Sequence, residues 1–169
     1  MLDKEIQEAL NEHLNFEMYS AYVYLAMTAY LSEQDLDGFA NWMKIQTQEE
    51  MFHADKFFNY INERGGRVKL KQINNPAFEW NSPLAAFEDA LEHEKEVTRR
   101  IYHLVDLALE KHDHGTNNFL QWFIAEQIEE EASVDEIVKQ LRMINGEGHG
   151  LLMLNRDLAS RSLDLPPSE

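Results

Sequence analysis

The chain of 169 residues contains no cysteine, which excludes disulfide bonds, thiolate metal sites and thiol chemistry. It has only 4 prolines and is 44% hydrophobic, which suits one compact domain over residues 1–169 that buries roughly two thirds of its unfolded surface. No apolar run approaches the ~20 residues of a membrane-spanning helix, so we expect no membrane partner. The first residues lack the basic and apolar regions of a signal peptide, and we predict a cytoplasmic protein.

Basic residues are also few, since 15 lysines and arginines face 31 aspartates and glutamates, for a net charge of −16. This charge argues against nucleic acid as a partner, because phosphates require a basic surface. Solubility alone would explain the acidity. A surface or cavity that attracts cations is the alternative explanation, and the positions of the acids bear on the choice.

Apolar residues recur with helical spacing along four long stretches, which predicts an all-α bundle. The expected helices span about residues 3–32, 35–64, 83–111, 117–145 and, as a short fifth helix, 149–160. A tail at 161–169 follows, which we expect to be loose from Leu163 onward. Residues 65–81 have no helical period and are long enough to run the length of a bundle. We therefore predict a four-helix bundle with a long crossover between the second and third helices.

Polar side chains interrupt the apolar stripe of each long predicted helix near its middle. They are Glu17, Glu50, His53, Glu94, Gln127 and Glu130. The paired positions, Glu50-x-x-His53 and Gln127-x-x-Glu130, place two side chains one helical turn apart. Glu17 lies 33 residues before Glu50, and Glu94 lies 33 residues before Gln127. A single glutamate followed by a paired motif therefore occurs twice, as a metal site with ligands from all four helices requires.

Four glutamates that face one core repel one another, and an unpaired buried carboxylate costs several kcal/mol. The apolar stripes contain no lysine or arginine that would neutralise them. Two divalent cations would balance the four charges, and oxygen ligands with one imidazole suit iron or manganese, or zinc less selectively. The alternative is that the glutamates are exposed. The buried face would then have to be assigned wrongly on each of the four helices independently.

Other side chains near these positions either take part in the metal site or have an ordinary packing or surface role. Tyr24 lies two turns beyond Glu17 on the same face, so its hydroxyl either reaches the site or packs in the core. Three more glutamates are next to the inward-facing residues in the sequence, namely Glu49, Glu126 and Glu129. They form either an outer cation site or a solvent-exposed face of the helices. Met51 raises the question of haem, since methionine ligates haem iron in some proteins. Methionine at a helical position is more commonly a packing residue, and we expect no haem.

The combined motifs resemble the non-haem ferritins of bacteria and archaea. They are Glu17-x6-Tyr24, Gln48-Glu49-Glu50-Met51-Phe52-His53, His93-Glu94 and the stretch Asn118–Glu131. The resemblance extends from about residue 3 to residue 160 and implies a ferritin-like bundle assembled into a homo-oligomeric shell of twenty-four subunits. It also implies a ferroxidase, a ferrous iron:oxygen oxidoreductase that stores iron. Dioxygen or hydrogen peroxide would oxidise the ferrous iron, which is deposited in the shell as ferric oxyhydroxide.

The resemblance further implies a di-iron centre and a possible third iron site in this sequence. The ligands of the first iron would be Glu17, Glu50 and His53. Those of the second would be Glu50 as a bridge, Glu94 and Glu130, with Gln127 close by. Those of the third, toward the cavity, would be Glu49, Glu126, Glu129 and Glu130. Tyr24 corresponds to a catalytic tyrosine beside the iron pair.

Two alternatives remain at this point. A bacterioferritin-like variant would bind haem, and Met51 stands where its haem ligand would be. Bacterioferritins resemble the same bundle but have a second E-x-x-H, where this chain has Gln127-x-x-Glu130. The other alternative is a non-enzymatic structural bundle with a vestigial metal site.

Overall fold

The computed structural model describes residues 2–146 and 148–164. These residues form five helices and no strand. The helices are α1 (Lys4–Glu33), α2 (Asp37–Glu63), α3 (Pro83–Glu110), α4 (His114–Met143) and α5 (Gly148–Leu158). The predicted all-α bundle with a long crossover and a short fifth helix is therefore confirmed. Residues 165–169 of the tail expected to be loose lie outside the described residues.

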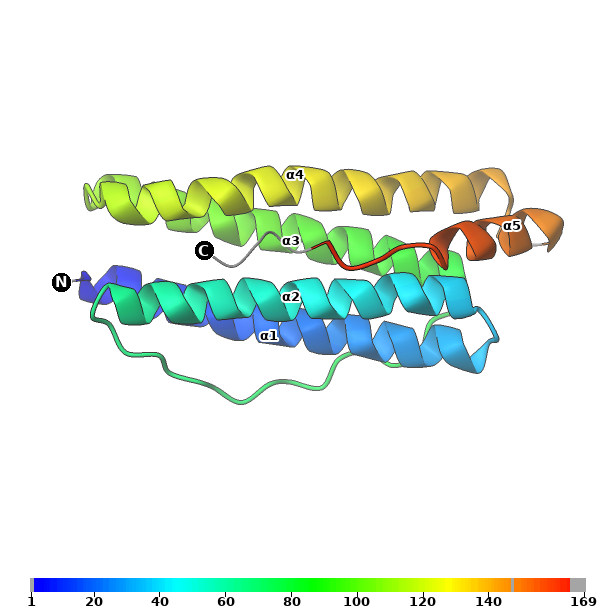
Figure 1. The fold of residues 1–169 in the computed structure, drawn as a ribbon, viewed down its shortest axis with the longest axis horizontal. Helices are drawn as coiled ribbons and strands as arrows, with labels where there is room; N and C mark the ends of the chain where they lie inside the picture. The colour runs from blue at the N-terminus through cyan, green and yellow to red at the C-terminus, as the bar shows by residue number, and fades with distance from the viewer. Residues whose placement is uncertain (1, 147, 165–169) are drawn as a thin grey trace.

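The four long helices lie side by side as two antiparallel pairs, α1 with α2 and α3 with α4 (Figure 1). The crossover returns from the end of α2 to the opposite end of the bundle, where α3 begins (Figure 1). α5 packs against α2. After α5 the chain turns back along the bundle (Figure 1). The central residues of all four long helices therefore lie at the same level, halfway along the bundle.

Amide side chains on α1 anchor the crossover. Gln7, Asn11 and Asn15 are spaced four residues apart and share one face of the helix. Their side-chain oxygens accept hydrogen bonds of 2.9, 2.6 and 2.6 Å from alternate backbone N–H groups, those of Arg67, Lys69 and Lys71. Four helical residues advance ~6 Å and two extended residues ~6.6 Å, so the two rows stay in register. A long segment without secondary structure is thus held along the bundle.

The buried apolar side chains form two clusters, one in each half of the bundle. One cluster includes Tyr24, Phe39, Met43, Phe87 and Val134. The other includes Leu14, Phe57, Val97, Leu120 and Phe123. Each long helix contributes to both clusters, and its polar interruption lies between the two contributions. Within the described part of the chain, no helix has the long apolar stretch that crossing a bilayer requires.

α4 begins at His114, three residues before the predicted start at 117. The helix starts earlier because Asp113 is its N-cap, and the Asp113 carboxylate accepts a 3.0 Å hydrogen bond from the backbone N–H of Thr116. Arg64, at the end of α2, donates to the same carboxylate at 2.9 Å. The cap therefore also ties the ends of two helices together.

Replacing Gly38 with alanine is expected to loosen α5. A Cβ atom at Gly38 would lie 1.6 Å from the backbone oxygen of Asn155 in α5, so one of the two helices must move. Hydrogen exchange of the α5 backbone amides should become at least ~10-fold faster in Gly38→Ala, which corresponds to ~1.4 kcal/mol of local stability.

Gly115→Ala is the matched control for this substitution. Its added Cβ meets the end of the Arg64 side chain at 2.9 Å and Asp113 Oδ1 at 3.4 Å, and neither residue belongs to α5. Alanine is also the better helix former, so α5 should exchange as in the unmodified protein. Equal exchange rates in both variants would contradict the observed packing of α5 on α2.

Candidate metal centre

The polar layer between the two apolar clusters contains the side chains that interrupt the stripes. They are Glu17 from α1, Glu50 and His53 from α2, Glu94 from α3, and Gln127 and Glu130 from α4, and the Tyr24 hydroxyl reaches them from the neighbouring apolar cluster. All are buried, and the most accessible of them, Glu130, is 8% exposed. The alternative in which the four glutamates face solvent is therefore excluded.

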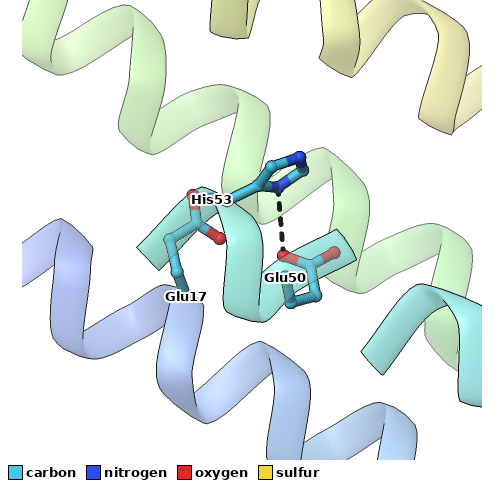
Figure 2. A group of neighbouring side chains, drawn as sticks. All are labelled: Glu17, Glu50 and His53. Carbon is cyan, nitrogen blue, oxygen red and sulfur yellow. Dashed lines mark ion pairs between the residues drawn. The ribbon is translucent and has the colours of Figure 1, made fainter. Parts of the chain in front are cut away.

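The possible ligand atoms of this layer form two groups that share Glu50. One group is Glu17, Glu50 and His53, and the other is Glu50, Glu94 and Glu130. Within each group, one ligand atom of every residue lies within 4.8 Å of the others. Figure 2 shows Glu17 reaching from α1 toward the Glu50 and His53 side chains of α2, where His53 Nδ1 is 3.5 Å from Glu50 Oε2. A carboxylate common to both groups is suited to bridging two neighbouring ions.

Several carboxylate oxygens in this layer are buried without a hydrogen-bond donor among the described residues. They are Oε2 of Glu17, Oε2 of Glu50 and Oε2 of Glu130. A buried anionic oxygen without a donor is costly, and a bound cation would remove that cost. The oxygen-rich donor set with one imidazole therefore fits a pair of divalent transition-metal ions.

Gln46 on α2 orients two of the carboxylates. Its side-chain nitrogen donates to Glu50 Oε1 at 3.1 Å and to Glu130 Oε1 at 3.0 Å. These bonds hold two glutamates from different helices at one place and leave their Oε2 atoms without donors. Gln46 belongs to the inward stripe of α2, but its role was not predicted. Its position four residues before Glu50, on the same face, is the signal that would have found it.

Two side chains orient the Glu94 carboxylate in the same way. Tyr24 Oη donates to Glu94 Oε1, and Gln127 Nε2 donates to Glu94 Oε2 at 3.0 Å. The tyrosine hydroxyl therefore reaches the site rather than merely packing in the core. In this arrangement the amide of Gln127 is a hydrogen-bond donor to a possible ligand, and its own role as a ligand stays a prediction.

His13 on α1 is a site residue that the sequence analysis missed. Its Nε2 is 2.7 Å from Glu17 Oε1, and the ring is 2% exposed. The ring packs against Phe57, with centroids 4.7 Å apart, so its orientation is fixed from the apolar side as well. The spacing of four residues to Glu17 was the available signal.

The pKa values of the four glutamates differ because their surroundings differ. Burial raises the pKa of Glu94 to about 7, although hydrogen bonds from Tyr24 and Gln127 oppose the shift. Burial and the neighbouring carboxylates raise the pKa of Glu50 and of Glu130 well above the usual value. Burial acts in the same direction on Glu17, but His13 and His53 outweigh it and lower the pKa to about 2. Without bound cations, Glu50, Glu94 and Glu130 thus keep their protons to higher pH, whereas Glu17 is ionised.

The acids proposed for an outer site are not gathered as closely. Among the described residues, Glu49, Glu126 and Glu129 do not belong to either group of converging ligand atoms. They influence each other electrostatically, since Glu126 raises the pKa of Glu49 and Glu129 raises that of Glu126, in both cases in addition to burial. Glu49 is instead paired with Arg161, which follows α5. The outer iron site stays a prediction.

Two other positions from the sequence analysis lie at the edge of the site. The Met51 side chain is 48% exposed on α2. His93, beside Glu94, bonds through Nε2 to Ser20 Oγ at 2.8 Å and stacks on Phe16 at 5.2 Å. Burial lowers the pKa of His93 to about 4, so the ring is neutral at pH 7.

The raised pKa values predict that the metal-free protein loses stability as the pH rises. The folded state holds the Glu94 proton up to about pH 7, whereas the unfolded chain releases it near 4.5, so stability falls across that window. The lowered pKa of Glu17 acts only below about 4.5 and does not contribute there. Thermal unfolding of the metal-free protein should show a falling melting temperature across this window.

The same experiment with Glu94→Gln should give a shallower slope, because the amide does not titrate. Saturating Zn²⁺ should also flatten the slope, since cations bind the ionised carboxylates. A melting temperature that rises over this range in the wild-type protein, or slopes that coincide in the two proteins, would contradict the electrostatic account.

Known proteins are similar to this chain in both sequence and fold. A family model described as a ferritin-like domain matches residues 7–144. Bacterial non-heme ferritins from Staphylococcus aureus and Staphylococcus saprophyticus are 39% and 42% identical over 164 residues, and each alignment covers 97% of this chain and at least 98% of the relative. An open-pore ferritin from the archaeon Archaeoglobus fulgidus is 50% identical, with a TM-score of 0.94 over 96% of this chain and 99% of that one. This chain therefore belongs to the ferritin family.

Proposed function

We propose that this protein stores iron and has ferroxidase activity at a di-iron centre in each subunit. The observation that carries the proposal is the pair of ligand groups sharing Glu50, buried in the middle of the bundle. One ferrous ion would be held by Glu17, Glu50 and His53. A second would be held by Glu50, Glu94 and Glu130, with Gln127 and Tyr24 orienting Glu94.

Two adjacent ferrous ions suit the reduction of a dioxygen molecule. Each ion gives up one electron, and dioxygen takes two electrons and two protons to become hydrogen peroxide, which leaves two ferric ions. Hard carboxylate oxygens favour the more highly charged ferric state, so the same ligands that collect the substrate also favour its oxidation. Hydrogen peroxide is an alternative oxidant, because it also accepts two electrons.

The storage part of the proposal rests on similarity along almost the whole chain. The alignment with the Staphylococcus aureus ferritin covers 97% of this chain, and the fold agrees with that of the Archaeoglobus fulgidus ferritin at a TM-score of 0.94. We therefore propose a single domain over residues 1–169 in a homo-oligomeric shell of twenty-four subunits in the cytoplasm. Ferric oxyhydroxide would collect inside it. The outer acids Glu49, Glu126 and Glu129, together with Glu130, would serve a third iron on its way to the cavity.

Glu50→Gln should reduce ferrous iron oxidation to the uncatalysed rate, because this variant removes the charge common to both ligand groups. The measurement adds ferrous iron in air to the pure protein and follows the ferric absorbance. Glu92→Gln is the matched control, since the same chemical change falls on an exposed residue of α3 paired with Lys95. Particle size is measured before and after iron addition.

Two results would defeat the proposal. One is a wild-type rate no faster than the background, together with a particle of monomer size. The other is unchanged iron oxidation in Glu50→Gln and in Glu50→Ala combined with His53→Ala, which is the behaviour of a structural bundle with a vestigial site.

Tyr24→Phe should slow iron oxidation more than it weakens metal binding. The variant keeps the ring in the apolar cluster but removes the hydroxyl that donates to Glu94 Oε1. Loss of one orienting neighbour of a ligand typically costs ~10- to 100-fold in activity or affinity. Stopped-flow oxidation and Zn²⁺ titration separate the two effects. Equal losses in both would assign Tyr24 to the ligand framework rather than to the reaction.

A further inference from the structure

The chain that follows α5 is attached to the side of α2 by Arg161. The Arg161 guanidinium lies over the Trp42 ring, 4.2 Å from its centroid, and donates to the Trp42 backbone oxygen at 3.1 Å. Asn41 Nδ2 donates to the backbone oxygen of Arg161 at 3.0 Å. A residue without helical structure of its own is therefore held at a defined position on α2.

The same guanidinium reaches two polar side chains of α2. Its Nη2 donates to Gln46 Oε1 at 3.1 Å and to Glu49 Oε2 at 2.5 Å. Both ends of the Arg161–Glu49 pair are largely shielded, with side chains 22% and 18% exposed, so solvent screens it less than a surface pair. Gln46 uses its other end to donate to Glu50 and Glu130. One amide side chain thus separates Arg161 from the metal centre.

Glu49 is also one of the three acids proposed to belong to the outer iron site alone, since the fourth, Glu130, is proposed as a ligand of the second iron as well. The other two, Glu126 and Glu129, make no ion pair among residues 2–146 and 148–164 and do not converge with Glu49 on a common point. The position of Glu49 is instead determined by Arg161. A divalent ion carries twice the charge of the guanidinium and is attracted by all three carboxylates, whereas Arg161 reaches only one of them.

We propose that Arg161 is an internal counter-cation of Glu49, and that a metal ion occupies the outer acidic site only by displacing it. The inference rests on the proposed function, because it concerns a site next to the di-iron centre. Displacement also breaks the bond from Arg161 to the Gln46 oxygen, but not the bonds that the Gln46 nitrogen donates to Glu50 and Glu130. Arg161 thereby sets the affinity of the outer site.

The test is a calorimetric titration of the iron-free protein with Zn²⁺, which binds carboxylate and imidazole ligands without redox chemistry. The wild-type protein should bind two ions tightly and a third more weakly. In Arg161→Gln the third ion should bind roughly 10-fold more tightly, since one competing cation is gone, while the first two are unchanged. Arg142→Gln is the control, because it removes an arginine from a more exposed pair, with Glu88 on α3.

A second measurement uses the wild-type protein alone. The backbone N–H groups of Ala159, Ser160 and Arg161 are hydrogen-bonded to the last turn of α5. Their hydrogen exchange should become faster when the third equivalent of Zn²⁺ is added, and not when the first two are added. Slower or unchanged exchange at the third equivalent overturns the inference.

The other outcomes are equally distinct. Absence of the two tight ions from every protein defeats the proposed function itself. Two tight ions with a third that is missing, unchanged or weaker in Arg161→Gln overturns only the role of Arg161 as a competitor. Weaker binding of the first two ions in Arg161→Gln also overturns it, because Arg161 would then support the centre.

Discussion

Four glutamates from four helices share one buried layer, and their mutual repulsion is the constraint that the surrounding side chains must offset. The layer lies between two apolar clusters, so each helix must be apolar, then acidic, then apolar again along the same face. Such carboxylates destabilise the bundle when ionised and unpaired. Bound cations would turn the same layer into a link among all four helices and so couple metal binding to the stability of the fold.

The neighbours of the carboxylates restrict their geometry without neutralising them. Gln46 holds Glu50 and Glu130, and Gln127 holds Glu94. These amides donate to one oxygen of each carboxylate and carry no charge. His13 differs, because it lies on the Glu17 side and lowers the pKa of that glutamate together with His53, against the effect of burial. One member of the layer is therefore ionised even without a bound cation, while the others keep their protons to higher pH.

The segment that follows α5 brings the positive charge of Arg161 next to Glu49 on α2. Arg161 reaches the α2 side chains next to the buried layer from a part of the chain more than a hundred residues away. Figure 1 shows why this is possible, since the chain doubles back along the bundle after α5. The docking of α5 on Gly38 fixes where this return begins.

The sequence by itself determined the helices, the crossover and the inward-facing acids, because helical periodicity is a local property that a polar residue visibly interrupts. Glu17, Glu50, Glu94 and Glu130 were recognisable in this way, and the paired spacing added His53. Only the tertiary structure decided which atoms meet across helices. The Tyr24–Glu94 bond, the Gln46 bridge and the attachment of Arg161 to Glu49 join residues whose separation along the chain carries no periodic signal. The rotation and axial offset of packed helices set such contacts, and these depend on the whole core rather than on any one stretch of sequence.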